Sequence, residues 1–180
     1  MGLNRRIPRV LHDDHVAVIS MLQRFTAALD DVEPEQVPDI ADGGFSGLLG
    51  ELVIAVDGEI ADHFALEEQD LFPALEAAGE GGLGAMLTEE HDVILPLGRR
   101  VAQKAELARK NGFDIESWKT FRRMGHEFAG MLIAHAEKEE IGLVPLLDEI
   151  LEPDEDAQMA DAYAAGDIKA QRGPAMEPAT

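Results

Sequence analysis

The 180-residue chain has no cysteine, one tryptophan and one tyrosine, and only 15 lysine and arginine residues against 36 aspartates and glutamates. Without cysteine it cannot form a disulfide, a thiolate-bound zinc site, an iron–sulfur cluster or a thiol nucleophile. Any metal must therefore be held by histidine and carboxylate side chains. The missing cysteines also favour a reducing compartment.

The formal net charge is −21. Such an excess repels the phosphates of nucleic acids and the anionic headgroups of membranes, so the sequence argues against both partners. No apolar run reaches the ~18 residues of a membrane-spanning helix, and the first residues, MGLNRRIPRV, lack an apolar signal core. We therefore predict a soluble, cytoplasmic protein.

Aromatic residues make up 5% of the chain, and alanine, leucine, glutamate and methionine dominate its periodic segments, as is typical of helices. Proline, glycine and Asn-Gly signals delimit four long predicted helices, at residues 8–31, 45–78, 85–110 and 114–151. Short connections force consecutive helices to lie antiparallel. The predicted fold class is therefore all-α, an up-down-up-down four-helix bundle with a metal site in its core.

The length of the chain predicts one such bundle rather than two domains. We assign residues 1–152 to the bundle and residues 153–180 to an acidic C-terminal extension. The extension is predicted to carry one short amphipathic turn at residues 159–163, and its last eight residues to be disordered.

Two of the predicted helices each turn one histidine and one glutamate toward the apolar core, and the other two each turn one histidine. In both pairs the glutamate follows the histidine by four residues, which puts the two side chains on one helix face. Burying two carboxylates without partners would cost several kcal/mol each, so the pattern predicts that cations neutralise them. The candidate metal ligands are His15, His63, Glu67, His91, His135 and Glu139.

The chain also repeats part of itself. The segments HFALEEQDLFPAL (63–75) and HAEKEEIGLVPLL (135–147) begin 72 residues apart, and Asp14-His15 and Glu90-His91 form a fainter second pair. The repeat predicts two helical hairpins related by pseudo-symmetry. Imidazole and carboxylate ligands without sulfur suit iron, manganese or zinc, and two carboxylates placed by pseudo-symmetry favour two ions over one.

These residues resemble the hemerythrin-like proteins, also called HHE cation-binding domains. The resemblance covers about residues 9 to 151 and rests on DDHVAVI, HFALEEQDLFP, EEHDVI and HAEKEEIGLVP. It implies a non-haem centre of two iron ions, with an oxo or hydroxo bridge, that reacts with O₂, NO or a related small diatomic. By the same resemblance the four histidines are terminal ligands and the two glutamates are bridges, at positions His15, His63, His91, His135, Glu67 and Glu139.

One position departs from the oxygen-carrying members of that family. They place a second histidine one turn after the ligand of the third helix, where this chain has Leu95. Two six-coordinate ions would then keep about two positions open instead of one. Glu59, one turn before His63, and His12 are the candidates to fill an open position. Glu59 is better explained as a partner of a ligand, and His12 as a surface residue.

The preferred function is therefore binding or sensing of a small diatomic, because a more open centre disfavours reversible O₂ transport. One alternative is a peroxidase- or catalase-like di-iron oxidoreductase acting on peroxide, so the sequence leaves enzymatic activity open. Another is an iron-storage module or an interaction module that metal stabilises.

Several neighbouring residues receive minor assignments. Glu68 and Glu140, next to the two predicted bridges, are expected to face solvent or to contact a ligand. His126 is expected to face solvent. Trp118 and Tyr163 receive no role.

Overall fold

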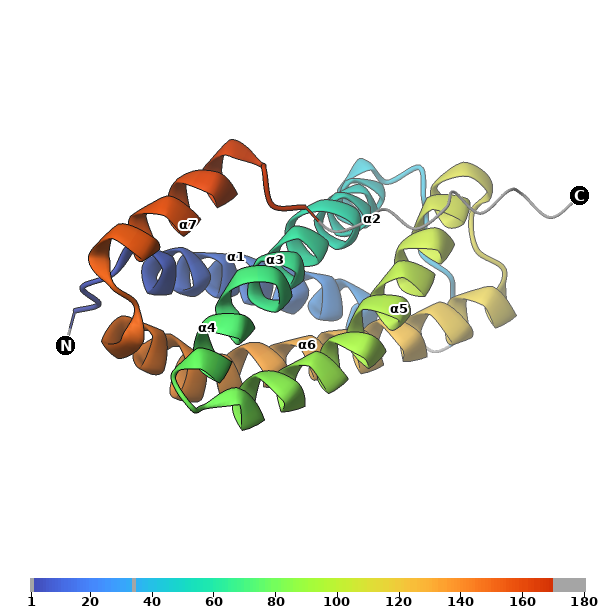
Figure 1. The fold of residues 1–180 in the computed structure, drawn as a ribbon. Coiled ribbons are helices and arrows are strands. Elements are labelled where there is room, and N and C mark those ends of the chain that lie inside the picture. Colours follow the sequence, from blue (N-terminus) through green and yellow to red (C-terminus); the bar gives the residue numbers. More distant parts are fainter. Residues whose placement is uncertain (1, 34, 170–180) are drawn as a thin grey trace, which may run out of the picture.

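The protein folds into helices (Figure 1), and the computed structural model describes residues 2–33 and 35–169. Those residues contain no strand, which confirms the all-α fold class for them. None of the helices in these ranges is long and apolar enough to cross a bilayer. The expected disorder of residues 173–180 lies outside the described residues. Three long helices are uninterrupted: α1 (Arg6–Asp30), α5 (Gly81–Asn111) and α6 (Ile115–Ile150).

The segment predicted as one helix over residues 45–78 is helical in five consecutive pieces. Two π-helical turns interrupt it, one ending before His63 and one beginning at Glu67. A π turn adds a residue to the helical turn and so rotates the side chains that follow it, and such turns are frequent at functional sites. The pieces are α2 (Gly43–Ala55), η1 (Val56–Ile60), α3 (Ala61–Leu66), η2 (Glu67–Leu71) and α4 (Phe72–Ala77).

The first and last long helices run in opposite directions. Just before α1, the backbone N–H groups of Asn4 and Arg5 donate to Asp148, near the end of α6. At the other end of α1, Asp30 pairs with Arg122, near the start of α6, at 3.0 Å. The helix α1 packs directly on α6, and α5 packs against α6, α2 and α4.

Two apolar clusters fill the interior. One includes Phe25, Phe121 and Phe128, and the other includes Leu11 and Leu147. Along each of the four long segments, the predicted metal ligands lie between residues of the first cluster and residues of the second. The apolar core therefore surrounds the polar centre from both ends, which keeps bulk water away from it.

Glycine permits the closest helix contacts in the first cluster. A Cβ atom on Gly98 of α5 would lie 2.6 Å from Phe128 of α6. A Cβ atom on Gly125 of α6 would lie 2.8 Å from Leu29 of α1. Any side chain at these two positions would push the helices apart, because packed interiors leave no spare volume.

After residue 152 the chain forms a helix, α7 (Pro153–Ala165), where the sequence predicted only a short turn. Pro153 lies in its first turn together with three acidic residues, and Gly166 ends it in the left-handed conformation. The proline, the acidic first turn and the left-handed glycine are each favourable signals for a helix end. The division of the chain into two parts at residue 152 stays a prediction.

The new helix packs on α1 (Figure 1) and completes its N-terminus. The buried carboxylate of Asp156 accepts the backbone N–H of Arg6 at 2.8 Å and that of Ile7 at 2.7 Å. Arg5, the residue that precedes α1, provides no side-chain cap. Since the first N–H groups of a helix have no partner within it, α7 supplies acceptors that α1 lacks.

Candidate metal centre

The fold brings all six predicted ligands into one buried cluster, and none exposes more than 6% of its surface. Their nitrogen and oxygen atoms form two groups, and within each group the atoms lie within 4.8 Å of one another. The histidines His15 and His63 belong to one group, and His91 and His135 to the other. Both glutamates belong to both groups. Their assignment as ligands stays a prediction.

Glu67 stands between the two groups. One carboxylate oxygen lies 3.3 Å from His63 Nε2, and the other lies 3.2 Å from His91 Nε2. Burial opposes ionisation of this carboxyl group, but the facing imidazoles outweigh it and hold the pKa of Glu67 below its ordinary value. The glutamate is therefore an anion in an apolar interior.

Glu139 occupies the corresponding place on α6. Its two oxygens lie 3.1 Å from His135 Nε2 and 3.0 Å from His15 Nε2. Burial lowers the pKa of His63 and of His135, yet the negative carboxylates around them raise both above the ordinary value. The space between these side chains thus attracts positive charge, whether a proton or a metal ion brings it.

The orientation of the polar atoms tests whether a cation fits. His15 Nε2, His63 Nε2 and all four oxygens of Glu67 and Glu139 are buried and make no hydrogen bond, although they lie close together. In the other group, His91 Nε2 and His135 Nε2 face each other at 3.0 Å. Unsatisfied buried polar atoms are costly, and converging imidazole nitrogens and carboxylate oxygens are a ligand set suited to iron, manganese or zinc. The residues therefore fit a metal centre.

The other ring nitrogen of each histidine faces a second carboxylate. Glu140 lies 2.7 Å from His15 Nδ1, and Glu68 lies 2.8 Å from His91 Nδ1. Because a carboxylate can only accept, each Nδ1 carries the proton and donates it, which leaves Nε2 with a free lone pair toward the centre. Glu68 and Glu140, which were expected to face solvent or to contact a ligand, thus each contact a histidine of the cluster.

Two further carboxylates of this kind were not identified from the sequence. Asp14 lies 3.0 Å from His63 Nδ1, and Glu90 lies 2.8 Å from His135 Nδ1. Both acids precede a histidine of their own helix but contact a histidine of another helix. The fainter repeat, Asp14-His15 and Glu90-His91, was the signal that could have found them.

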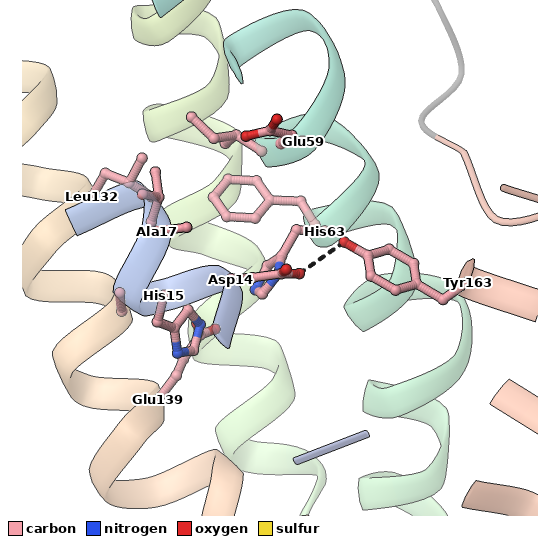
Figure 2. A pocket seen from close by; sticks show the side chains of 12 residues that line it. Asp14, His15, Ala17, Glu59, His63, Leu132, Glu139 and Tyr163 are labelled. Carbon is pink, nitrogen blue, oxygen red and sulfur yellow. Dashed lines mark hydrogen bonds and ion pairs between the residues drawn. The ribbon is translucent and has the colours of Figure 1, made fainter. Parts of the chain in front are cut away.

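These two carboxylates differ in what holds them. Lys138 donates to Glu90, whereas the hydroxyl of Tyr163 donates to Asp14 Oδ2 at 2.9 Å (Figure 2). Burial beside the negative charge of Asp14 raises the pKa of Tyr163, so the phenol keeps its proton and is the donor. Tyr163 lies in α7, and no sequence pattern indicated this contact.

A cavity of about 360 Å³ adjoins one half of the cluster. His15 and His63 line it from two different helices, Glu59 lies at its upper end in the view and Tyr163 stands beside Asp14 (Figure 2). Its wall also includes apolar side chains, which are Ala17, Val18, Ile60, Phe64, Leu132 and Ala136. A small, mostly apolar cavity of this kind suits a small ligand.

The remaining candidates do not join the cluster. Glu59 lies within the π turn η1; it is exposed and borders the cavity without joining either group of potential ligands. His12 is half exposed and pairs with Glu140 at 2.9 Å. His126 is partly exposed and lies 3.1 Å from Asp30. Leu95 is half-buried against the first apolar cluster.

Comparison with known proteins agrees with this geometry. The chain matches the family model of the hemerythrin HHE cation binding domain over residues 6–147. No curated protein matches it. The matched range contains all six clustered residues and ends before α7, the helix that carries Tyr163. Because the match covers well over half of the chain, the protein belongs to the hemerythrin HHE cation-binding domain family.

Proposed function

We propose that this protein is a hemerythrin-like di-iron protein that binds or senses O₂, NO or a related small diatomic. In this proposal each ion is held by two histidines from different helices, and both ions share the two glutamates. The terminal ligands are His15 and His63 on one ion and His91 and His135 on the other, and the bridges are Glu67 and Glu139.

The observation that carries the proposal is the membership of both glutamates in both groups. A single ion would need only one group. The two groups share both carboxylates, and each group has two histidines of its own. This division matches the requirement of a doubly bridged pair of ions. The pseudo-symmetry of the sequence favours the same count.

A pair of reduced irons, when bound, supplies the two electrons that a small diatomic can accept. The chain's own residues prepare the site for this. Asp14, Glu68, Glu90 and Glu140 hold the Nδ1 protons of the four histidines, so every Nε2 points to the centre with its lone pair. The apolar clusters at both ends exclude water, and the cavity leaves room for a ligand beside His63.

We further infer that the four long segments form an up-down-up-down bundle in a cytoplasmic protein. The opposite directions of α1 and α6 support this topology. So does the contact between Phe128 of α6 and Gly98 of α5, together with that between His135 of α6 and Glu90 of α5, since residue numbers fall along one helix as they rise along the other.

The decisive experiment measures metal content and the visible spectrum of protein purified from iron-supplied cells. We expect about two irons per chain, as two carboxylate-bridged ions require, and the oxo-to-iron charge-transfer bands of an oxo bridge between the oxidised ions. His63→Ala and Glu139→Ala should each lose at least one iron. His126→Ala, outside the cluster, should retain both. Full retention in the two site variants would contradict the ligand assignment.

The same preparation separates the alternatives. Steady turnover of hydrogen peroxide would favour the oxidoreductase over a binding or sensing protein. A colourless, zinc-loaded protein that reacts with neither O₂ nor NO would favour a module in which metal only stabilises the bundle or is stored. A stable spectrum with O₂ or NO bound, without turnover, supports the preferred function.

A further inference from the structure

We propose that the outer face of α5 between Val93 and Leu107 is a docking surface for an acidic amphipathic helix of a partner protein. This surface, the α5 basic face, consists of Val93, Pro96, Arg99, Arg100, Lys104 and Leu107. It lies outside the candidate metal centre, and it would bind its partner whether or not metal is present.

Positive charge is concentrated in one stretch of this acidic chain. Residues 93–126 contain eight of the 15 lysines and arginines but three of the 36 aspartates and glutamates. The rest of the chain is therefore even more negative than the net charge of −21 indicates. A cationic surface on such a protein is a local feature, and it attracts acidic groups that the rest of the molecule repels.

The cations of this stretch differ in whether they have partners. Those that pair with carboxylates are Arg109, Lys110, Lys119, Arg122 and Arg123. In contrast, Arg99, Arg100 and Lys104 form no ion pair or hydrogen bond with any residue that the structure describes. Among the lysines and arginines in the described ranges, Lys169 alone shares this property. Three cations within six residues are therefore available to carboxylates of another molecule.

The unpaired cations lie between two exposed apolar side chains. Val93 and Leu107 each expose 54% of their surface. Positions 93, 96, 100, 104 and 107 recur every three or four residues and therefore lie along one side of the helix. At 1.5 Å per residue the face is about 21 Å long, which matches about four turns of a partner helix. Apolar contacts at both ends and cations between them would recognise a helix that carries acidic residues between apolar ones.

The opposite side of α5 holds this face in place. Ile94, Leu97 and Val101 are buried, and Gly98 lies against Phe128 of α6. The backbone that carries the cations is therefore fixed before a partner arrives, which lowers the entropy cost of binding. Substitutions on the outer face leave these core contacts untouched.

A single acidic helix fits this face better than a more extended anion does. Nucleic acids and anionic membranes would extend beyond about 21 Å of α5 and meet the acidic remainder of the protein, which repels them. A second copy of the chain brings its own net charge of −21 and is disfavoured for the same reason. The face begins two residues after His91, so the partner would bind the helix that carries one of the clustered histidines.

Photo-crosslinking of the full chain, in the cells that make it, identifies the occupant. The photoreactive amino acid p-benzoylphenylalanine is placed at Gln103, which is exposed beside the cations. It should capture an acidic protein, which mass spectrometry then identifies. The matched control carries the same group at Gln23, which is exposed on α1, and should not capture that protein.

Charge reversal tests what holds the partner. Combining Arg99→Glu, Arg100→Glu and Lys104→Glu should lower the crosslinking yield at least about tenfold, because attraction becomes repulsion. The control triple variant changes the net charge equally on other faces, and its yield should stay at the wild-type level. It combines Lys119→Glu, Arg123→Glu and Lys169→Glu.

The apolar ends are tested with the purified chain and the purified protein identified by crosslinking. Leu107→Ala should weaken binding several-fold in calorimetry, whereas Ile54→Ala, at an exposed apolar residue of α2, should not. Raising the salt concentration should weaken binding of the wild type, because salt screens the charges. Thermal unfolding of each variant serves as the control for folding.

Equal capture from Gln103 and Gln23 would overturn the proposal, as would crosslinks to nucleic acid, to lipid or to a second copy of the chain. A yield that the charge reversal at α5 leaves unchanged would overturn it as well. None of these measurements depends on iron. A chain that took up no iron but captured an acidic protein from Gln103 would contradict the proposed function and still support the docking surface.

Discussion

Tyr163 donates a 2.9 Å hydrogen bond to Asp14 Oδ2, the same oxygen that lies 3.0 Å from His63 Nδ1. The contact connects α7, which lies beyond the family match, to a histidine of the proposed centre. On the other half, Lys138 takes this place next to Glu90. A neutral hydroxyl therefore donates to Asp14, whereas a cationic ammonium group donates to Glu90. The two pseudo-symmetric halves thus differ in the charge next to the carboxylate.

Asp14→Asn should weaken metal binding by about 10- to 100-fold, the usual effect of losing a carboxylate that orients a ligating histidine. The amide keeps the shape of the side chain but removes the charge that supports His63. Competition with a chelator of known affinity measures the change. The exposed neighbour Asp13 supplies the matched control, since Asp13→Asn should leave the affinity at the wild-type value. Equal affinities in both variants would remove Asp14 from the site.

Tyr163→Phe should have a smaller effect in the same direction. The substitution keeps the ring, which lines the cavity, and deletes one hydrogen bond. Such a bond is worth about 0.5–1.5 kcal/mol, which corresponds to roughly two- to tenfold in metal affinity. The chelator competition used for Asp14 measures it. A loss larger than that of Asp14→Asn would mean that Tyr163 acts by another route than through Asp14.

Two glycines of α6 form a matched pair for the helix contacts. Gly125→Ala should lower the free energy of unfolding by about 1–3 kcal/mol, because the added Cβ would overlap Leu29 and Phe25. A Cβ on the exposed Gly130 would meet no atom within 4 Å, so Gly130→Ala should raise stability by about 0.5–1 kcal/mol. Urea unfolding measures both. Opposite signs are expected, and stabilisation by Gly125→Ala would refute the tight contact.

Asp156→Ala should destabilise the protein by about 1–3 kcal/mol, because two backbone N–H groups at the start of α1 would lose a charged acceptor in a buried place. Hydrogen exchange should then become faster in α7 and in the first turn of α1. Glu155→Ala, in the same turn of α7 but exposed, is the control. Unchanged exchange in α7 would show that Asp156 does not hold this helix in place.

The stabilising effect of Asp148, which accepts backbone N–H groups just before α1, should depend on pH. The backbone N–H groups of Arg5 and Asn4 hold its pKa below the ordinary value. A carboxyl group with a lowered folded pKa stabilises the protein above its unfolded pKa, and this contribution is lost as the pH falls through the folded pKa. The gap in melting temperature between wild type and Asp148→Asn should therefore be present near neutral pH and shrink in acid. Glu149→Gln, an exposed neighbour, should show no such pH-dependent gap.

Helical periodicity was enough to place the six clustered residues, because a side chain's position around a regular helix depends only on its spacing from its neighbours. It failed where the helix is irregular. The segments HFALEEQDLFPAL and HAEKEEIGLVPLL are alike, yet only the first contains a π turn. Glu59 lies within the first π turn, where a periodicity of 3.6 residues does not apply, and it is exposed instead of joining the cluster.

By itself, then, the sequence determined the helical class, the buried histidines and glutamates, and their division into two similar halves, since these follow from composition, spacing and repetition. Only the tertiary structure decided which acid stands behind each histidine, that α7 reaches Asp14 through Tyr163, and that open space lies beside His63 but not beside His91. Each of these depends on side chains from different helices meeting, and no periodicity along one segment contains that information.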